Sequence, residues 1–509
     1  MKEFAVSLTQ EDSRPLYEQI YEAIRDAILS GHLPRGEKLP STRTEAQFLS
    51  CSRSTVALAY DQLLAEGYIE SQPWRGYYVS DVRDLYHLTV REESAAESWR
   101  QEETGQEWEV DFSPNGVDLS QFPYEAMGRI MRNLLLDERE LVLQSSSPSG
   151  DRNLKSAICD YLFRSRSVRC VPEQIVIGAG NEYLLILLSQ ILGPDHRVAM
   201  ESPTYLQAYR TFRSIGYPVE VIAMDREGLC TSQLQETEAD IAYVMPSHQF
   251  PTGTLMPMKR RLELIGWAMG QDGRYIIEDD YDSEFRYRGK PVPALQGLDR
   301  SGRVIYLGTF SRSIAPSIRI SYLVLPVELL ERYRTRCGFY ACSVPNIMQQ
   351  SIYRLMQEGY FEKNLNRMRG VYKTRHDFLL SELRKCPWVE KVRGENAGLH
   401  LLIEVNGERS EEEILIQCRE RNVRVYGLSE YFIRNHRESP VRDRTHPAAD
   451  PMRTEAMPVS VGASENEYSG RPVLLLGYGG LDEEQIRLGL EVLGEAAIGN
   501  QQPKTIESI

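Results

Sequence analysis

The segment Gly308–Arg319 has the sequence Gly-Thr-Phe-Ser-Arg-Ser-Ile-Ala-Pro-Ser-Ile-Arg and directly follows the apolar run Val304–Leu307. A short apolar run that ends in turn residues is typical of a buried strand. Four similar runs precede it, with helical segments between several of them: Ile175–Ile177, Arg197–Met200, Ile241–Val244 and Tyr275–Ile277. This alternation predicts an α/β domain over residues 110–380, with a largely parallel sheet covered by helices on both faces.

Candidate binding sequences directly follow two of the predicted strands. Gly178-Ala179-Gly180-Asn181-Glu182 opens a helix that reaches Leu192. A glycine turn at a helix N-terminus binds phosphate through its N–H groups and the helix dipole, although such turns also join many strands to helices. The segment Ile277–Phe285 carries Asp279 and Tyr281 in an acidic stretch, which is either a binding site or a surface loop.

Gly308–Arg319 resembles the cofactor-lysine segment of fold-type I pyridoxal 5′-phosphate (PLP) enzymes, which reads Ser-x-Lys-x-x-x-Pro-x-x-Arg. Where that family carries the lysine that forms a Schiff base with PLP, this chain has Arg312. A guanidinium stays protonated in proteins and is not a nucleophile. No catalytic residue is therefore predicted, and covalent attachment of PLP is not expected.

The resemblance implies PLP-binding roles for nine residues. Asp279 would hold the pyridine nitrogen, Tyr281 would hydrogen-bond the ring oxygen, and Tyr205 would stack on the ring. The phosphate cup would comprise Gly180, Asn181, Glu182, Thr309, Ser311 and Arg319. Arg312 would add a permanent cation that pairs with Asp279 or with the phosphate.

The N-terminal residues 1–80 predict a separate domain of three helices and a hairpin. Leu16, Ile20, Ile24 and Ile28 have helical spacing, a second helix begins near Ser41 or Thr42, and Ser52 is a suitable N-cap for a third that ends at Gly67. Tyr68–Glu70 and Gly76–Val79 then read as two short strands. This order describes a winged helix-turn-helix of the α+β class.

The segments Gly36–Arg43, Ser52–Val56 and Leu63–Ile69 resemble the GntR-type winged helix, which implies binding to a double-stranded DNA operator. A helix N-terminus with hydroxyls and an arginine suits phosphates and a guanine edge. The candidate DNA-binding residues are Arg43, Ser52, Arg53, Ser54, Thr55 and Arg75. The alternative is a winged helix that serves only protein contacts, in which Ser52 is a plain cap.

The rest of the chain predicts a linker at 81–109 and a smaller α+β C-terminal domain at 381–499. Residues 433–470 are expected to be a disordered insertion, and 500–509 a loose tail. The chain has a net charge of −14, no apolar run long enough for a membrane span, and eight cysteines without a Cys-x-x-Cys pair. These features favour a cytoplasmic protein with neither a metal site nor membrane contact.

Pro246–Gly253 resembles the aminotransferase Asn-Pro-x-Gly loop, with Phe250 at the Asn position. Together with the winged helix this resembles the MocR/GabR-type regulators, in which a GntR-type winged helix is fused to a fold-type I aminotransferase-like domain. That resemblance implies a transcription regulator, a head-to-tail homodimer, and sensing of PLP with an amine or amino acid. Three functions stay open: a sensor without turnover, a working aminotransferase, and a scaffold without PLP. Arg312 counts against the second, and a PLP–amine adduct held non-covalently would also fit the first.

Overall fold

The computed structural model describes residues 14–81, 107–287, 292–434 and 470–498. The chain divides into two units, Met1–Gln106 and Glu107–Ile509. None of the helices in these ranges is long and apolar enough to cross a membrane. Residues 435–469 of the predicted insertion at 433–470, the tail at 500–509 and most of the linker lie outside the described residues.

The N-terminal unit is a winged helix-turn-helix, as predicted. Its elements are α1 (Leu16–Leu29), α2 (Thr42–Phe48), α3 (Arg53–Ala65) and a hairpin of β1 (Ile69–Gln72) and β2 (Gly76–Val79). The side chains of Ser41 and Ser52 cap α2 and α3 by accepting from the backbone N–H three residues later. Val56 and Tyr60 of α3 are fully buried, so one face of this helix forms the core and leaves its N-terminus exposed.

The large domain of the second unit contains an eight-stranded sheet in the order β4-β11-β10-β9-β8-β5-β6-β7. Neighbouring strands from β10 across to β6 pair in parallel, while β4, β11 and β7 pair antiparallel. The strands are β4 (Ile175–Gly178), β5 (Val198–Ser202), β6 (Val219–Asp225), β7 (Gly228–Leu229), β8 (Ile241–Val244), β9 (Tyr275–Asp280), β10 (Val304–Thr309) and β11 (Ser321–Val324). The predicted, largely parallel sheet is confirmed, and the antiparallel pairings of β4, β11 and β7 toward its edges make it mixed.

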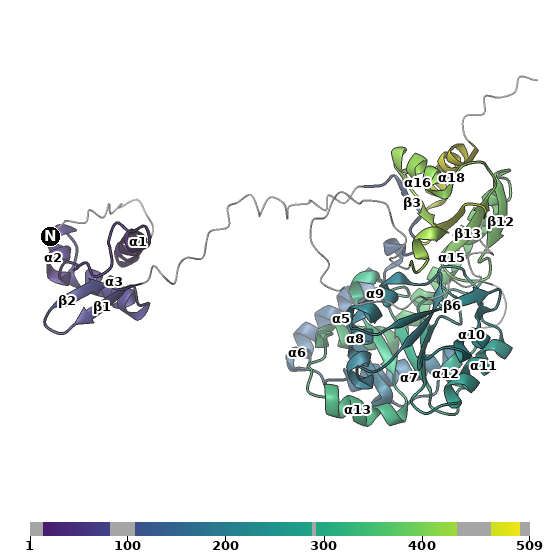
Figure 1. Ribbon diagram of the computed structural model, residues 1–509, viewed down its shortest axis with the longest axis horizontal. Coiled ribbons are helices and arrows are strands. Elements are labelled where there is room, and N and C mark those ends of the chain that lie inside the picture. Colours follow the sequence, from purple (N-terminus) through teal and green to yellow (C-terminus); the bar gives the residue numbers. More distant parts are fainter. Residues whose placement is uncertain (1–13, 82–106, 288–291, 435–469, 499–509) are drawn as a thin grey trace, which may run out of the picture. The chain divides into compact units, whose positions relative to one another are not determined.

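Helices cover both faces of this sheet (Figure 1). On one face, Tyr243 and Ile277 pack with α8 and α13; on the other, Ala242 and Ile276 pack with α11 and α12. Alternation along each strand therefore gives every central strand two buried faces. The helices of this domain are α5 (Tyr124–Asp137), α6 (Arg139–Leu143), α7 (Arg152–Arg166), α8 (Asn181–Leu192), α9 (Leu206–Ser214), α10 (Thr231–Gln235), α11 (Met258–Met269), α12 (Leu295–Leu298), α13 (Val327–Cys337), α14 (Asn346–Gln357) and α15 (Tyr360–Leu383).

The small domain is α+β, as predicted. Its four-stranded sheet has the order β12-β13-β16-β15, and a short parallel pair joins β3 to β14. The elements are β3 (Val110–Asp111), β12 (Val389–Arg393), β13 (His400–Val405), α16 (Glu411–Glu420), β14 (Val423–Arg424), β15 (Tyr426–Gly427), β16 (Val473–Gly477) and α18 (Glu483–Ile498). Because β3 precedes the large domain in sequence but pairs with β14, the segment after β3 runs between the two domains.

Candidate functional site

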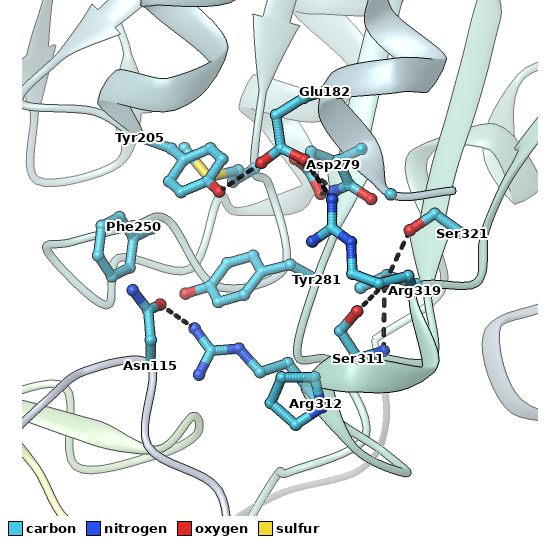
Figure 2. A pocket seen from close by; sticks show the side chains of 15 residues that line it. Asn115, Glu182, Tyr205, Phe250, Asp279, Tyr281, Ser311, Arg312, Arg319 and Ser321 are labelled. Atoms are coloured by element: carbon cyan, nitrogen blue, oxygen red, sulfur yellow. Dashed lines mark hydrogen bonds and ion pairs between the residues drawn. The ribbon is translucent and has the colours of Figure 1, made fainter. Parts of the chain in front are cut away.

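A cavity of about 190 Å³ lies at the C-terminal ends of β9 and β10 and at the N-terminus of α8. All nine residues predicted to bind PLP line it, and Arg312 lines it as well. Figure 2 shows their side chains converging from these separate elements. The predicted site residues are thus brought together, although segments as far apart as 180–182 and 309–319 supply them.

Asp279 forms the inner wall of the cavity. Its neighbour Asp280 faces the opposite side of β9 and binds Arg166 at 2.7 Å, whereas Asp279 accepts hydrogen bonds from Tyr243 at 2.5 Å and from Asn181 at 3.4 Å. Both Asp279 partners are neutral, and no ion pair to Asp279 is found in the described part of the chain. Burial, with a smaller contribution from Asp280, raises the pKa of the Asp279 carboxyl to about 7.

The N-terminus of α8 and Arg319 form the second wall. Gly180 has φ of 103°, and a Cβ there would clash with a guanidinium nitrogen of Arg319, so only glycine lets Arg319 pack this closely. Arg319 pairs with Glu182 at 3.2 Å, and Tyr205 donates to Glu182 at 3.1 Å. Burial opposes the ionisation of Glu182, but its own backbone N–H, Arg319 and Tyr205 lower its pKa overall.

Thr309 and Ser311 lie beside this wall on the segment that leaves β10. The Ser311 N–H donates to the Thr309 hydroxyl at 3.1 Å, and Ser321 of β11 donates to the same hydroxyl at 2.9 Å. The Thr309 hydroxyl in turn donates to the Ser311 hydroxyl at 3.1 Å, so among these three hydroxyls it is Ser311 that keeps a proton for an anion. The backbone N–H groups at the N-terminus of α8 are further donors suited to an anion. Asn181 adds a buried side-chain oxygen that has no hydrogen-bond partner among the residues that the structure describes.

Tyr281 crosses the cavity between these groups and Arg312 (Figure 2). Its hydroxyl lies 3.0 Å from Nδ1 of His248, which also contacts Asp282 at 2.8 Å. Burial raises the pKa of Tyr281 well above its ordinary value, and the charge of Arg312 opposes that rise. Tyr281 therefore stays a neutral hydroxyl inside the cavity.

Arg312 is placed differently from the expectation that it would pair with Asp279. Its guanidinium donates to the carbonyl of Pro114 at 3.1 Å and to the side-chain oxygen of Asn115. These acceptors belong to the segment after β3, of which Asn115 lines the cavity. Arg312 thus lies on the side of Tyr281 away from Asp279, and the expected pairing with Asp279 is wrong.

Sequence reasoning missed several residues of the cavity. Asn115 lines the cavity and binds Arg312, and Ser321 lines it from β11. Tyr243 does not line the cavity but binds Asp279 from β8. A tyrosine in an otherwise apolar strand was a usable signal, because a buried hydroxyl needs a partner. Asn115 carries no such signal, since Pro-Asn-Gly reads only as a turn. Glu430, which follows β15, is exposed and does not line the cavity.

Five of the six candidate DNA-binding residues lie at exposed positions of the winged helix, and Thr55 is half-buried. Arg53 and Ser54 begin α3, Arg43 lies in α2, and Arg75 lies in the turn of the hairpin. Ser52 is bound to Ser54 and Thr55 as well as capping α3. Beside Arg75, Trp74 is fully exposed, a feature that sequence reasoning missed.

Comparison with known proteins gives two family matches. Residues 16–79 match the family described as bacterial regulatory proteins, gntR family, and residues 118–439 match aminotransferase class I and II. The HTH-type transcriptional regulator YdeL of Bacillus subtilis is 38% identical over 82% of this chain and 89% of its own length. The probable rhizopine catabolism regulatory protein MocR of Rhizobium meliloti is 30% identical over 96% of this chain and 95% of its own.

The second unit also resembles solved aminotransferases. LysN, the α-aminoadipate aminotransferase of Thermus thermophilus, is 25% identical, with a TM-score of 0.61 over 76% of this chain and 92% of the enzyme. That structure contains N-(5′-phosphopyridoxyl)-L-leucine.

Proposed function

The chain belongs to the GntR family of transcription regulators, in the MocR-like group that carries an aminotransferase class I and II domain, and from this premise we propose that the second domain is a sensor that binds PLP without covalent attachment and without turnover. The function that follows from the family is that of a DNA-binding transcription regulator. PLP, effector sensing and dimerisation are the proposed additions.

The observation that carries this proposal is the buried carboxylate of Asp279, which has only neutral partners among the described residues. A buried carboxylate without a cation is costly unless it is protonated or a ligand supplies the charge. The protonated pyridine nitrogen of PLP is such a cation. Asp279 would then hold that nitrogen in its charged form.

The remaining groups of the cavity fit the rest of PLP. The N-terminus of α8, Ser311 and Arg319 offer donors to a phosphate, and the unpartnered oxygen of Asn181 offers an acceptor. Tyr281 offers a hydroxyl to the ring oxygen, and Tyr205 offers an aromatic face. When bound, PLP supplies an electrophilic aldehyde and an electron-withdrawing ring. The chain's own residues bind and orient the ring, and Arg312 offers no nucleophile to it.

A ligand-binding domain becomes a sensor when the ligand favours one of two states of the protein. Arg312 links the large domain to the segment after β3, which pairs with the small domain. A ligand that competes for Arg312 would therefore act on the contact between the two domains. An amine or amino acid that reacts with or displaces bound PLP is the proposed effector class.

The dimer is proposed from the family and from exposed apolar side chains. Leu135 and Leu136 of α5 and Leu141 and Leu143 of α6 are exposed, and α5 and α6 contact each other. Apolar surface of this kind is typical of a subunit interface. A dimer also offers two winged helices to two half-sites.

The sensing proposal is tested with a duplex selected by the full-length protein from a random library. Fluorescence anisotropy gives its Kd with and without PLP, and with PLP plus single amino acids. We expect the Kd to change at least threefold with PLP or with one of the mixtures. An unchanged Kd under all conditions that saturate the PLP site would reject sensing and favour a scaffold.

A further inference from the structure

The cavity presents opposite charges at its two ends. The proposal that follows from this arrangement rests on the proposed function. Asp279 lies at one end and Arg312 at the other, with Tyr281 between them (Figure 2). Among the described residues, Asp279 is a carboxylate without a cationic partner, and Arg312 is a cation without a carboxylate partner. In the described part of the chain, Arg312 contacts only the neutral oxygens of Pro114 and Asn115.

Arg312 has donors and no acceptor. A guanidinium carries five N–H donors and keeps its charge at every ordinary pH. It attracts a carbonyl or carboxylate oxygen and repels an ammonium group. Its contacts in the structure follow this rule, since both partners are oxygen acceptors.

The charge of Arg312 also acts inside the cavity. Burial lowers the pKa of His400 to about 3, with further contributions from His248 and Arg312. Burial raises the pKa of Tyr205, and Arg312 opposes that rise. Arg312 is therefore close enough to interact electrostatically with a ligand that lies between Tyr205 and Tyr281.

The chemistry of a pyridine ring then decides what faces Arg312. The ring nitrogen and carbon 4 are opposite each other on the ring, and the phosphate arm lies on carbon 5. A ring whose nitrogen binds Asp279, and whose phosphate binds Arg319 and α8, points its carbon 4 away from Asp279. The group on carbon 4 is therefore directed toward the Arg312 end of the cavity.

We propose that Arg312 makes this site selective for phosphorylated pyridines that carry a hydrogen-bond acceptor on carbon 4, an aldehyde or a carboxylate, and that it excludes those that carry an ammonium group there. A lysine at this position would lose its proton and react with an aldehyde, whereas Arg312 would attract the aldehyde oxygen without reacting with it. The site would distinguish the aldehyde form of the cofactor from its amine form.

Three ligands that differ only at carbon 4 test the proposal: PLP, pyridoxamine 5′-phosphate and 4-pyridoxic acid 5′-phosphate. Equilibrium dialysis against the full-length protein, in a buffer free of primary amines and phosphate, gives a Kd for each. Because the carboxylate ligand cannot form Schiff bases, it reports the site without adducts on surface lysines. We expect PLP and the carboxylate ligand to bind at least tenfold more tightly than the amine, from one charge-assisted hydrogen bond gained and one repulsion avoided.

Two variants separate the role of Arg312 from general damage to the site. Arg312→Gln, with Arg312→Met as a second version, should reduce the aldehyde-to-amine preference at least tenfold. Arg319→Gln should weaken all three ligands together and leave the preference unchanged, since all share the phosphate. Equal binding of the amine and aldehyde forms to the unaltered protein would overturn the inference but leave the proposed function standing. An unchanged preference in both Arg312 variants would do the same, and failure of all three ligands to bind would overturn both.

Discussion

The substitution Asp279→Asn tests whether the negative charge of Asp279 is what the cavity uses to bind PLP. The substitution would keep the size of the side chain and its hydrogen bonds to Asn181 and Tyr243 but remove the negative charge. A hydrogen bond to a charged group contributes about 1.5–3 kcal/mol. We therefore expect Asp279→Asn to raise the Kd for PLP about 10- to 150-fold.

The pH dependence of binding gives this prediction a second, independent signature. Because the pKa of Asp279 is raised to about 7 by burial, the carboxyl in the ligand-free protein is mostly protonated below pH 7. The unaltered protein should therefore lose PLP affinity as the pH falls from about 8 to 6. Asp279→Asn should lack this component, so the difference between the two proteins should shrink toward low pH.

The stability of the ligand-free protein should also depend on the ionisation of Asp279. Its pH dependence has the opposite sign, because this contribution to stability falls as the pH rises, whereas PLP affinity increases. A folded-state pKa of about 7, above the ordinary 3.8, means that the folded state binds the proton more tightly than the unfolded state. The contribution of Asp279 to stability is thus present below about pH 4 and is lost as the pH rises to about 7. Asp279→Asn should gain stability relative to the unaltered protein over that range, by up to about 1.4 kcal/mol per pH unit.

The measurements are equilibrium dialysis for PLP and chemical denaturation at a series of pH values. Asp195→Asn, at an exposed position in the segment before β5, is the matched control. The reasoning would be refuted if Asp279→Asn bound PLP as tightly as the unaltered protein at pH 8. It would also be refuted if the control variant showed the same loss.

Three further substitutions probe other parts of the account. Arg312→Lys should give a coloured, borohydride-trappable adduct with PLP, because the rest of the cavity is in place; a variant that stays colourless would show that the cavity does not bind PLP productively. Glu182→Gln should tighten PLP binding about threefold to tenfold in dialysis, since it frees Arg319 and removes a charge near the phosphate; weaker binding would contradict this. Arg53→Ala should weaken binding to the selected duplex at least about tenfold in anisotropy, while Arg25→Ala on α1 should change it less than threefold; equal effects would argue against α3 as the recognition helix.

The sequence predicted the elements whose residues carry strong periodicity or turn chemistry. The strands at β4, β5, β8, β9 and β10 were all predicted within two or three residues, because each is a buried apolar run. The strands β6, β7 and β11 were not singled out. The charged residue Glu220 interrupts the apolar residues of β6, and β7 has two residues, so neither strand forms an apolar run. β11 is a short run whose partner strands come from distant segments.

The nine predicted cofactor residues line one cavity because each stands at a strand end or helix start of a fold that was itself predictable. The hydrogen-bond acceptors of Arg312 could not be predicted in the same way. A long side chain can reach several partners, and its actual acceptors lie 198 and 197 residues away in the sequence. Pro114 and Asn115 reach the cavity partly through the pairing of β3 with β14, which involves two residues on each strand, and partly through other long-range contacts, such as the hydrogen bond from the Gly477 N–H to the Phe112 carbonyl.

The central claim is that this regulator binds PLP through its cavity and not through a covalent bond. The most direct measurement is equilibrium dialysis of the unaltered full-length protein against PLP, followed by borohydride reduction and intact-mass analysis of the saturated sample. The account predicts saturable binding of one PLP per chain, loss of that binding in Asp279→Asn, and no stoichiometric mass addition after reduction. Stoichiometric addition of a phosphopyridoxyl group to one lysine would contradict it, and so would the absence of saturable binding.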